Sequence, residues 1–261
     1  AWSCAQAQPV PRSRNSTRAA SSTAPRGAAP VPAGRHPSPP PRPPPPPLAG
    51  APRPAAGDPL AEALGRPAQV GTIALDPAGR RRMRVNGRSA PDGAGGLRIA
   101  ADQVFANCPK HIHRRSPADG PPGLPSAAVS DRLTLRQQLA VSTADTFFIA
   151  TAGPDGGIDA SHRGGSPGFV TVAGEDELAW PDYPGNAMFM TLGNLELDPR
   201  AGLLVPDWEG GGALLLTGRA RVEWSGPTAR TVGYRIERVV ELSGATSLTW
   251  TDEEAAVPAA R

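Results

Sequence analysis

Short apolar runs, separated by Gly, Pro and Asp, cover most of the chain after residue 57. Their alternation with polar residues and their content of Val, Ile, Thr and Phe predict strands that end at turn residues. Such a series of short strands with few helices favours a mainly β fold, an antiparallel barrel. The expected strands are Val70–Leu75, Arg81–Asn86, Leu97–Ala100, Thr146–Thr151, Ile158–Ser161, Phe169–Val172, Glu177–Trp180, Gly202–Pro206, Ala213–Trp224 and Tyr234–Leu242.

Only a few segments have helical spacing or helix-compatible composition. The expected helices are Asp58–Gly65, Ala101–His113 (interrupted by Pro109), Thr134–Ser142 and Ala187–Leu197. The segment Gly153–Gly157 predicts a hairpin turn, because its glycines allow positive φ and its proline fixes φ. Ser116–Pro125 has the composition of a linker.

The first 57 residues differ from the rest, because they contain no Asp or Glu and much of the chain's proline. Proline lacks the amide proton that helices and sheets need, and this stretch has few large apolar residues to bury. We expect a disordered Pro/Arg-rich tail, with polyproline II character near Pro43–Pro47.

Charge is unevenly distributed. Seven of the 27 basic residues lie in the tail, which leaves 20 basic against 24 acidic residues from Asp58 onward. The folded part is therefore mildly acidic, and a nucleic-acid partner is not expected. The sequence has no apolar run of membrane-spanning length and no signal-peptide core, so we expect no membrane partner and a cytoplasmic location. Two cysteines give no disulfide framework.

An internal similarity links two parts of the chain. Val85–Arg88 resembles Leu216–Arg219, and each follows an Asp-Pro pair upstream. If the two segments are equivalent strands of related halves, the first half lacks its opening strands, and the tail stands in their place. We interpret the N-terminus as truncated or wrongly framed. The partner strands of the first half would then expose an edge that favours dimer formation.

The segment Ser161-His162-Arg163-Gly164-Gly165 is the first candidate binding site. A phosphate needs a planar cationic donor, hydroxyl donors and backbone amides that can approach closely. Arg163 supplies the first, Ser161 the second and the glycines the third. An exposed turn with an incidental arginine is the alternative.

The segment Trp180–Asn186 is the second candidate. Trp180 ends a strand, so its ring could line a cleft, with Pro181 beside it. Asp182 could accept hydrogen bonds from hydroxyls, and Asn186 could face a phosphate at a helix start. The alternative makes Asp182 a turn residue and Asn186 a helix N-cap.

Two further readings of polar residues are weaker. Cys108, His111 and His113 could bind a metal, but structural zinc sites usually have four ligands, so no metal is expected. Lys110 could instead lie near an anionic ring, or be an ordinary surface residue. Ser161 and His162 are adjacent on a strand and point to opposite faces, so they do not form a nucleophile–base pair.

These motifs resemble the pyridoxamine 5′-phosphate oxidase-like flavin-binding proteins. The resemblance covers about residues 71–250 and is carried by Phe147–Thr151, Asp159–Gly165, Trp180–Asn186, Leu192–Leu195, Asp198–Leu203 and Leu216–Ala220. Asp102–Lys110 is similar to the segment that joins the halves in a two-part subgroup. The resemblance implies a split β-barrel that binds FMN at a dimer or pseudo-dimer interface.

By that resemblance, the cofactor-binding residues are Ser161, His162, Arg163, Gly164, Trp180, Pro181, Asp182, Asn186 and Lys110. Pro184–Ala187 stands where the oxidases carry an Arg-Lys pair, and nothing after Trp250 resembles their substrate segment, so vitamin B6 oxidation is not expected. Deazaflavin or haem in place of FMN stays open, and the catalytic residues are unknown.

We therefore divide the chain into a tail (1–57), a remnant of a first split-barrel half with its connecting segment (58–125), a split-barrel FMN-binding domain (126–250) and a C-terminal tail (251–261). The expected function is a flavin-dependent oxidoreductase that acts on an unidentified small substrate or electron donor, with a homodimer as one assembly. A non-catalytic flavin carrier or sensor, and a truncated inactive relative, are the alternatives. A polyproline ligand for an SH3-like groove is a third.

Overall fold

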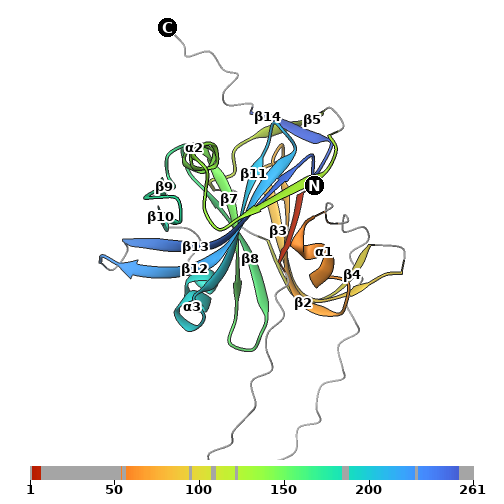
Figure 1. Ribbon diagram of the computed structural model, residues 1–261. Coiled ribbons are helices and arrows are strands. Elements are labelled where there is room, and N and C mark those ends of the chain that lie inside the picture. The colour runs from red at the N-terminus through yellow and green to blue at the C-terminus, as the bar shows by residue number, and fades with distance from the viewer. Residues whose placement is uncertain are drawn as a thin grey trace, which may run out of the picture.

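The computed structural model describes residues 2–6, 54, 57–93, 96–106, 110–120, 123–183, 188–226 and 229–252. These residues form a mainly β structure, a split barrel whose two main sheets meet at one strand, together with a separate two-stranded sheet (Figure 1). The helices are α1 (Pro59–Ala63), α2 (Leu135–Thr143) and α3 (Met190–Leu197). The strands are β1 (Trp2–Gln6), β2 (Ala68–Asp76), β3 (Arg81–Pro91), β4 (Leu97–Ala106), β5 (Arg115–Asp119), β6 (Ser126–Ser130), β7 (Thr146–Ala152), β8 (Ile158–Gly164), β9 (Thr171–Val172), β10 (Glu177–Pro181), β11 (Arg200–Asp207), β12 (Gly212–Trp224), β13 (Arg230–Ser243) and β14 (Leu248–Asp252).

The larger sheet runs in the order β8-β7-β11-β12-β13-β10-β9, with β6 also paired to β13. The predicted turn between β7 and β8 is confirmed: the Gly153 amide donates to the Gly157 carbonyl at 2.7 Å, and Gly156 has φ +81°. Asp155 accepts from the Gly157 amide at 3.1 Å, as turn aspartates do. The turn fixes the register of β8 against β7.

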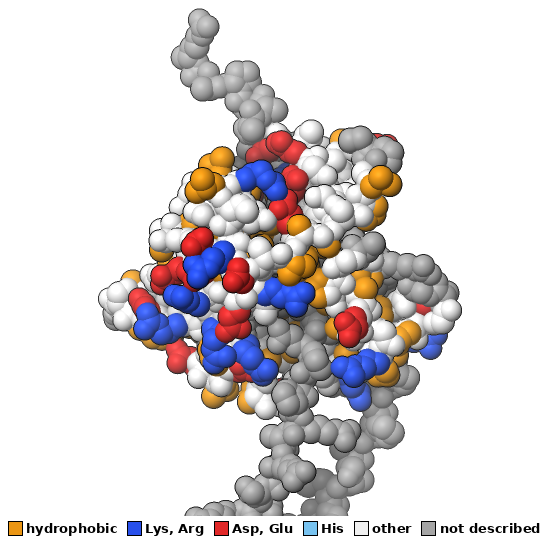
Figure 2. Space-filling model, viewed as in Figure 1, with side chains coloured by type: hydrophobic (Ala, Val, Ile, Leu, Met, Phe, Trp, Pro, Cys, Tyr) orange, Lys and Arg blue, Asp and Glu red, His pale blue; other side chains and the backbone are white. Residues whose placement is uncertain are grey.

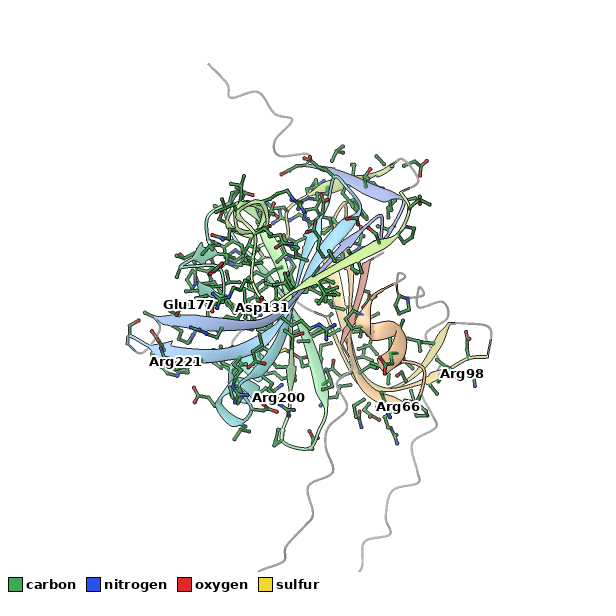
Figure 3. The ribbon with its side chains drawn as sticks, in the orientation of Figure 1. Arg66, Arg98, Asp131, Glu177, Arg200 and Arg221 are labelled. Atoms are coloured by element: carbon green, nitrogen blue, oxygen red, sulfur yellow. The ribbon has the colours of Figure 1, made fainter. Side chains whose placement is uncertain are left out.

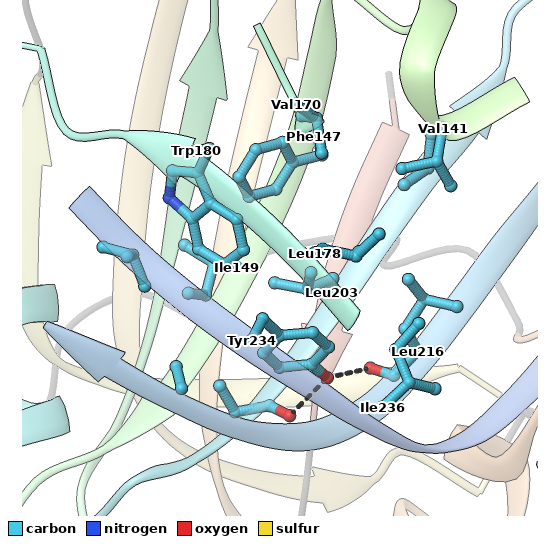
Figure 4. Close-up of a cluster of buried hydrophobic side chains, with 14 of the residues drawn as sticks. Val141, Phe147, Ile149, Val170, Leu178, Trp180, Leu203, Leu216, Tyr234 and Ile236 are labelled. Carbon is cyan, nitrogen blue, oxygen red and sulfur yellow. Dashed lines mark hydrogen bonds between the residues drawn. The ribbon is translucent and has the colours of Figure 1, made fainter. Parts of the chain in front are cut away.

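Aliphatic side chains from several strands and a few aromatic residues fill the barrel core (Figure 4). Phe147 packs edge-on against Trp180, with ring centroids 5.0 Å apart. The Tyr234 hydroxyl lies 3.0 Å from the carbonyl oxygens of both Ala201 and Leu216. Its polar end therefore ties β13 to β11 and β12 while its ring stays in the core.

Helices α1 and α2 begin at capping residues, whereas α3 begins after Phe189 without a side-chain cap. Thr134 caps α2 through a capping box, in which its side chain accepts from the Gln137 amide and the Gln137 side chain accepts from the Thr134 amide. Asp58 caps α1 and Pro59 follows at the first helical position. The helices predicted around Thr134–Ser142 and Asp58–Gly65 are thus confirmed.

The smaller sheet has the order β1-β2-β3-β4. The helix predicted over Ala101–His113 is wrong, because β4 continues through Ala106, which pairs with Met83 of β3. Long-range pairing outweighs the helix propensity of its alanines. Asn107–Pro109 lie outside the described residues. Within the predicted tail, Trp2–Gln6 forms β1 and pairs antiparallel with β2; residues 7–53 lie outside the described residues.

The linker predicted at Ser116–Pro125 is partly wrong. Its first residues belong to β5, which pairs with β14, so that Trp250 lies opposite Pro117. The two strands are far apart in sequence, and neither alternates clearly enough to reveal the other. Trp250, in the middle of β14, packs edge-on against Trp208, with centroids 6.2 Å apart.

The two sheets meet where β2 crosses β8, seen in Figure 1 where the orange strands lie beside the green one. Gly71 of β2 is the contact point. A Cβ there would lie 2.7 Å from the Ile158 carbonyl oxygen and 2.8 Å from the Ala160 amide nitrogen. Backbone meets backbone at this position, and only glycine fits.

We expect Gly71→Ala to lower the free energy of unfolding by about 1–3 kcal/mol, because the new methyl group must push the two backbones apart. Gly233→Ala is the matched control, since it changes a strand glycine whose Cβ position has no atom within 4 Å. Urea denaturation of both variants measures the difference. Equal stability of the two variants would contradict the close approach of β2 and β8.

Candidate functional site

The two predicted corners meet at the edge of the larger sheet. Arg163, near the end of β8, approaches Asp182, which follows β10, with Nη2 and Oδ1 3.5 Å apart. Arg230 reaches the same carboxylate, its Nε 3.1 Å from Oδ2, and the Asp182 amide donates to the Arg230 carbonyl. Both guanidinium groups are largely buried, so Asp182 neutralises charge that solvent does not screen.

A second buried ion pair joins β8 to the smaller sheet. Arg84 of β3 donates to Asp159 of β8, with Nη1 3.0 Å from Oδ2. Its Nη2 donates to the Ser161 hydroxyl at 2.7 Å, and Arg163 donates to the same hydroxyl at 2.7 Å. Asn86 adds a donor to Asp159 at 3.1 Å. Ser161 is therefore an acceptor for two arginines and links the two ion pairs.

His162 is buried between the sheets as a neutral ring. Its Nδ1 lies 2.7 Å from Nη1 of Arg82. A guanidinium only donates, so Nδ1 accepts and the proton is on Nε2. Burial, followed by the charges of Arg82 and Arg163, holds the pKa of His162 well below its ordinary value. The buried Nε2–H has no hydrogen-bond partner among the described residues.

The segment before β5 completes the site. His111 stacks on Tyr183, with centroids 5.5 Å apart and rings 20° from parallel. Partial burial, with the charges of Lys110 and Arg82, lowers the pKa of His111. Its Nε2 is also buried and lacks a partner among the residues that the structure describes. Lys110 is exposed at the rim.

Two described residues other than glycine have a backbone conformation that L-residues rarely adopt. Within the described residues, only Arg80 and His111 are non-glycine residues with positive φ, at 50° and 64°. Arg80 ends the β2–β3 turn two residues before Arg82, and His111 packs its carbonyl on Gly164. Such outliers cost free energy and persist where surrounding structure holds them, often at functional sites.

Two expectations about the site are corrected. The space at Gly164 and Gly165 is filled by the His111 carbonyl and the Phe169 ring, so these glycines permit close packing of the protein itself. The Trp180 ring does not line a cleft, because the pleat directs it into the aromatic core. Pro181 ends β10 opposite Thr231.

Asn186 lies outside the described residues, as does Cys108. Among the side chains that the structure describes, no three His, Cys, Asp or Glu groups are placed to hold a metal ion. No described helix is long and apolar enough to cross a membrane.

Four residues of the site were missed from the sequence: Arg82, Arg84, Asp159 and Arg230. The available signal was the alternation Arg82–Arg84–Asn86, which puts three polar residues on one face of a strand. A single strand does not reveal which element covers that face, so their contact with β8 could not be inferred.

Two cavities lie near these elements. One of about 240 Å³ borders the Asp159–Asn86 contact and extends to Asn194 of α3. It is smaller than most ligand clefts. Another of about 580 Å³ lies between α2 and the β11–β12 turn, and none of the predicted site residues lines it.

On the face shown in Figure 2, basic and acidic side chains are interspersed, and no large patch carries only one sign of charge. Exposed ion pairs such as Arg132–Glu175 and Arg221–Glu223 belong to this mixed surface. The buried cluster of cations at the junction of β3 and β8 therefore differs from its surroundings.

Residues 134–250 match the family model for pyridoxamine 5′-phosphate oxidase. Three solved structures are similar: a pyridoxamine 5′-phosphate oxidase candidate from Lactobacillus delbrueckii (19% identity, 42% of this chain, 94% of that chain, TM-score 0.34), HupZ from group A Streptococcus (11%, 41%, 92%, 0.34) and general stress protein 26 from Bacillus anthracis (10%, 45%, 98%, 0.31). None of the curated protein sequences matches this chain.

The buried neutral His162 predicts an acid-sensitive fold. Its folded-state pKa lies below the unfolded value of about 6.5, so the unfolded chain binds the extra proton first as the pH falls. The free energy of unfolding should fall as the pH drops below about 6.5. His162 contributes at most about 1.4 kcal/mol per pH unit to this fall. His162→Gln removes the titration and keeps a hydrogen-bonding side chain. Urea denaturation at several pH values should give the variant a smaller slope between pH 6.5 and 5; parallel slopes would contradict the buried neutral ring.

Proposed function

We propose that this chain, whose residues 134–250 belong to the pyridoxamine 5′-phosphate oxidase-like split-barrel family, binds a phosphorylated flavin at the junction of β3, β8 and Asp182. We further propose that it acts as a flavin-dependent oxidoreductase. The family typically binds flavin, and at this junction three of the residues predicted to bind the cofactor, Ser161, Arg163 and Asp182, are joined through Arg163, while His162 contacts Arg82.

The observation that carries the proposal is the set of buried donors without acceptors at this junction. The Nε2–H of His162 and the Nε–H of Arg84 are both buried and have no partner among the described residues. A buried donor without a partner costs about 1–3 kcal/mol, so a ligand that brings acceptors is favoured there. Phosphate oxygens and ring carbonyls are such acceptors.

The charges at the junction fit an anionic group as well. Arg82, Arg84, Arg163 and Arg230 stand against two carboxylates, those of Asp159 and Asp182. We therefore assign the positive side of the junction to the phosphate. Asp159 and Asp182 hold the arginines in place, and each of their carboxylate oxygens faces an arginine or Asn86.

When bound, a flavin supplies hydride or electron transfer. This chain's residues bind and orient it: His162 donates one hydrogen bond, the arginines hold negative charge, and the stacked pair of His111 and Tyr183 offers a flat edge. Because neither carboxylate is free for proton transfer, a non-catalytic flavin carrier is the second candidate. Haem or a deazaflavin in place of FMN would give different visible spectra.

A titration of the purified chain with FMN and with riboflavin tests the ligand. We expect FMN to bind at least about tenfold more tightly, the difference that one phosphate contact of about 1.4 kcal/mol makes. His162→Phe should weaken FMN binding about tenfold or more, because the ring nitrogen donor is lost, whereas His162→Gln retains a donor and should bind nearly as well. Fluorescence quenching gives both constants. A chain that is colourless as purified and leaves added FMN free in solution would refute the assignment.

Anaerobic mixing of the FMN-loaded chain with NADPH separates enzyme from carrier. An oxidoreductase should bleach the flavin and regain its colour with an acceptor over many turnovers. A carrier would bind FMN with the same affinity and show no turnover above that of free FMN.

A further inference from the structure

Two hairpins of the molecule share one backbone pattern. In the β2–β3 hairpin, Gly71 lies opposite Asn86, and the pairing of β3 with β4 shifts register after Asn86. In the β11–β12 hairpin, Gly202 lies opposite Thr217, and the pairing of β12 with β13 shifts register after Thr217. The glycine that follows each shift has a carbonyl of the next strand at its Cβ position: Ala100 for Gly87, and Arg235 for Gly218.

The turns of the two hairpins also correspond. Asp76 accepts from the Gly79 amide at 3.0 Å, and Asp207 accepts from the Gly210 amide at 2.8 Å. The next residue has positive φ in both: Arg80 at 50° and Gly211 at 66°. The two turns thus share this backbone conformation, with glycine at the positive-φ position in one and arginine in the other.

The hairpins differ in the charge on their inner face. Arg80, Arg82 and Arg84 occupy the positions that Gly211, Ala213 and Leu215 occupy in the other hairpin. Arg82 and Arg84 both face β8, where they contact His162 and Asp159. Only the β2–β3 hairpin therefore carries cations at this position.

Packing within the protein does not explain why position 80 is an arginine. Glycine has no steric cost at positive φ, and arginine does. The Nε of Arg80 is buried and has no hydrogen-bond partner among the described residues. The carboxylate of its own turn, Asp76, already pairs with Arg81 and caps Gly79. A partly buried arginine with a positive φ and a buried, unpaired Nε–H is expected where a ligand supplies the missing acceptor.

We propose that Arg80 and Arg82, on the β2–β3 hairpin, bind the phosphate group of the ligand whose remainder lies against β8. Arg84 has the different task of neutralising Asp159. This inference rests on the proposed function and adds the phosphate-binding residues to it. It also makes the β2–β3 hairpin part of the binding site, so that the larger sheet alone is insufficient.

Arg80→Gly tests the inference, because it installs the residue that the other hairpin uses at the same φ. We expect the Kd for FMN to rise about ten- to a hundredfold, as for a lost charge-assisted hydrogen bond, with the Kd for riboflavin changed less than about threefold. The urea midpoint should not fall, since glycine suits the backbone. Arg82→Gln should shift FMN binding in the same direction.

Arg88→Gln is the control, since Arg88 is an exposed arginine on the same strand and pairs with Asp102 at 3.5 Å. It should bind FMN as the unaltered chain does. If the unaltered chain binds FMN and the Arg80→Gly variant binds it equally well, this inference is wrong and the proposed function stands. Equal losses for FMN and riboflavin, or a lower urea midpoint for Arg80→Gly, would mean a structural role and also overturn it. If the unaltered chain does not bind FMN, the proposed function fails, and this inference fails with it.

Discussion

The buried contact between β8 and the β2–β3 hairpin is the constraint on which the site depends. Gly71 lets the two backbones touch, and the Arg84–Asp159 pair lies directly beside that contact. Burying two charges is costly unless each is paired and hydrogen-bonded, and here Ser161 and Asn86 complete the pairing. Removing one partner would leave an uncompensated charge between the sheets, so the contact favours one alignment of the two.

That alignment determines what the rest of the junction can do. With β8 held against β3, Arg82 meets His162 and fixes its tautomer, which turns Nε2–H away from the arginine. On the other side of β8, Arg163 shares Asp182 with Arg230, whose guanidinium lies 5.0 Å from the ring centre of Phe189. Arg200 and Arg221, labelled in Figure 3, lie on β11 and β12 away from this junction, and each pairs with a carboxylate two residues from it in sequence. The charged side chains of the junction therefore differ from those of the surface. They are buried, and some of their N–H groups have no hydrogen-bond partner among the described residues.

Local chemistry made parts of the fold predictable from the sequence. The Gly153–Gly157 turn and the capping box at Thr134 are encoded within a few residues, and both form as expected. The segment after Ala101 was assigned to a helix because its alanines favour one, yet its pairing with β3 is what decides its conformation. The same limit hid the pairing of β5 with β14.

The candidate site was predictable to a similar depth. Arg163 and Asp182 were selected for their chemistry, and the fold brings them within 3.5 Å. Ser161 and His162 are neighbours on β8, and their side chains contact different groups: Ser161 accepts from Arg84 and Arg163, and His162 contacts Arg82. The sequence did not reveal that Arg84 would donate a hydrogen bond to the Ser161 hydroxyl, or that the Trp180 ring would enter the core. Both contacts depend on which sheet covers which face of the strand. The most direct test of a phosphate held between β8 and the β2–β3 hairpin is phosphorus-31 NMR of FMN bound to the chain across pH 5 to 7. A phosphate paired with arginines should stay doubly charged, with a shifted resonance that does not titrate in this range; a resonance that titrates near its ordinary second pKa of about 6 would contradict the account.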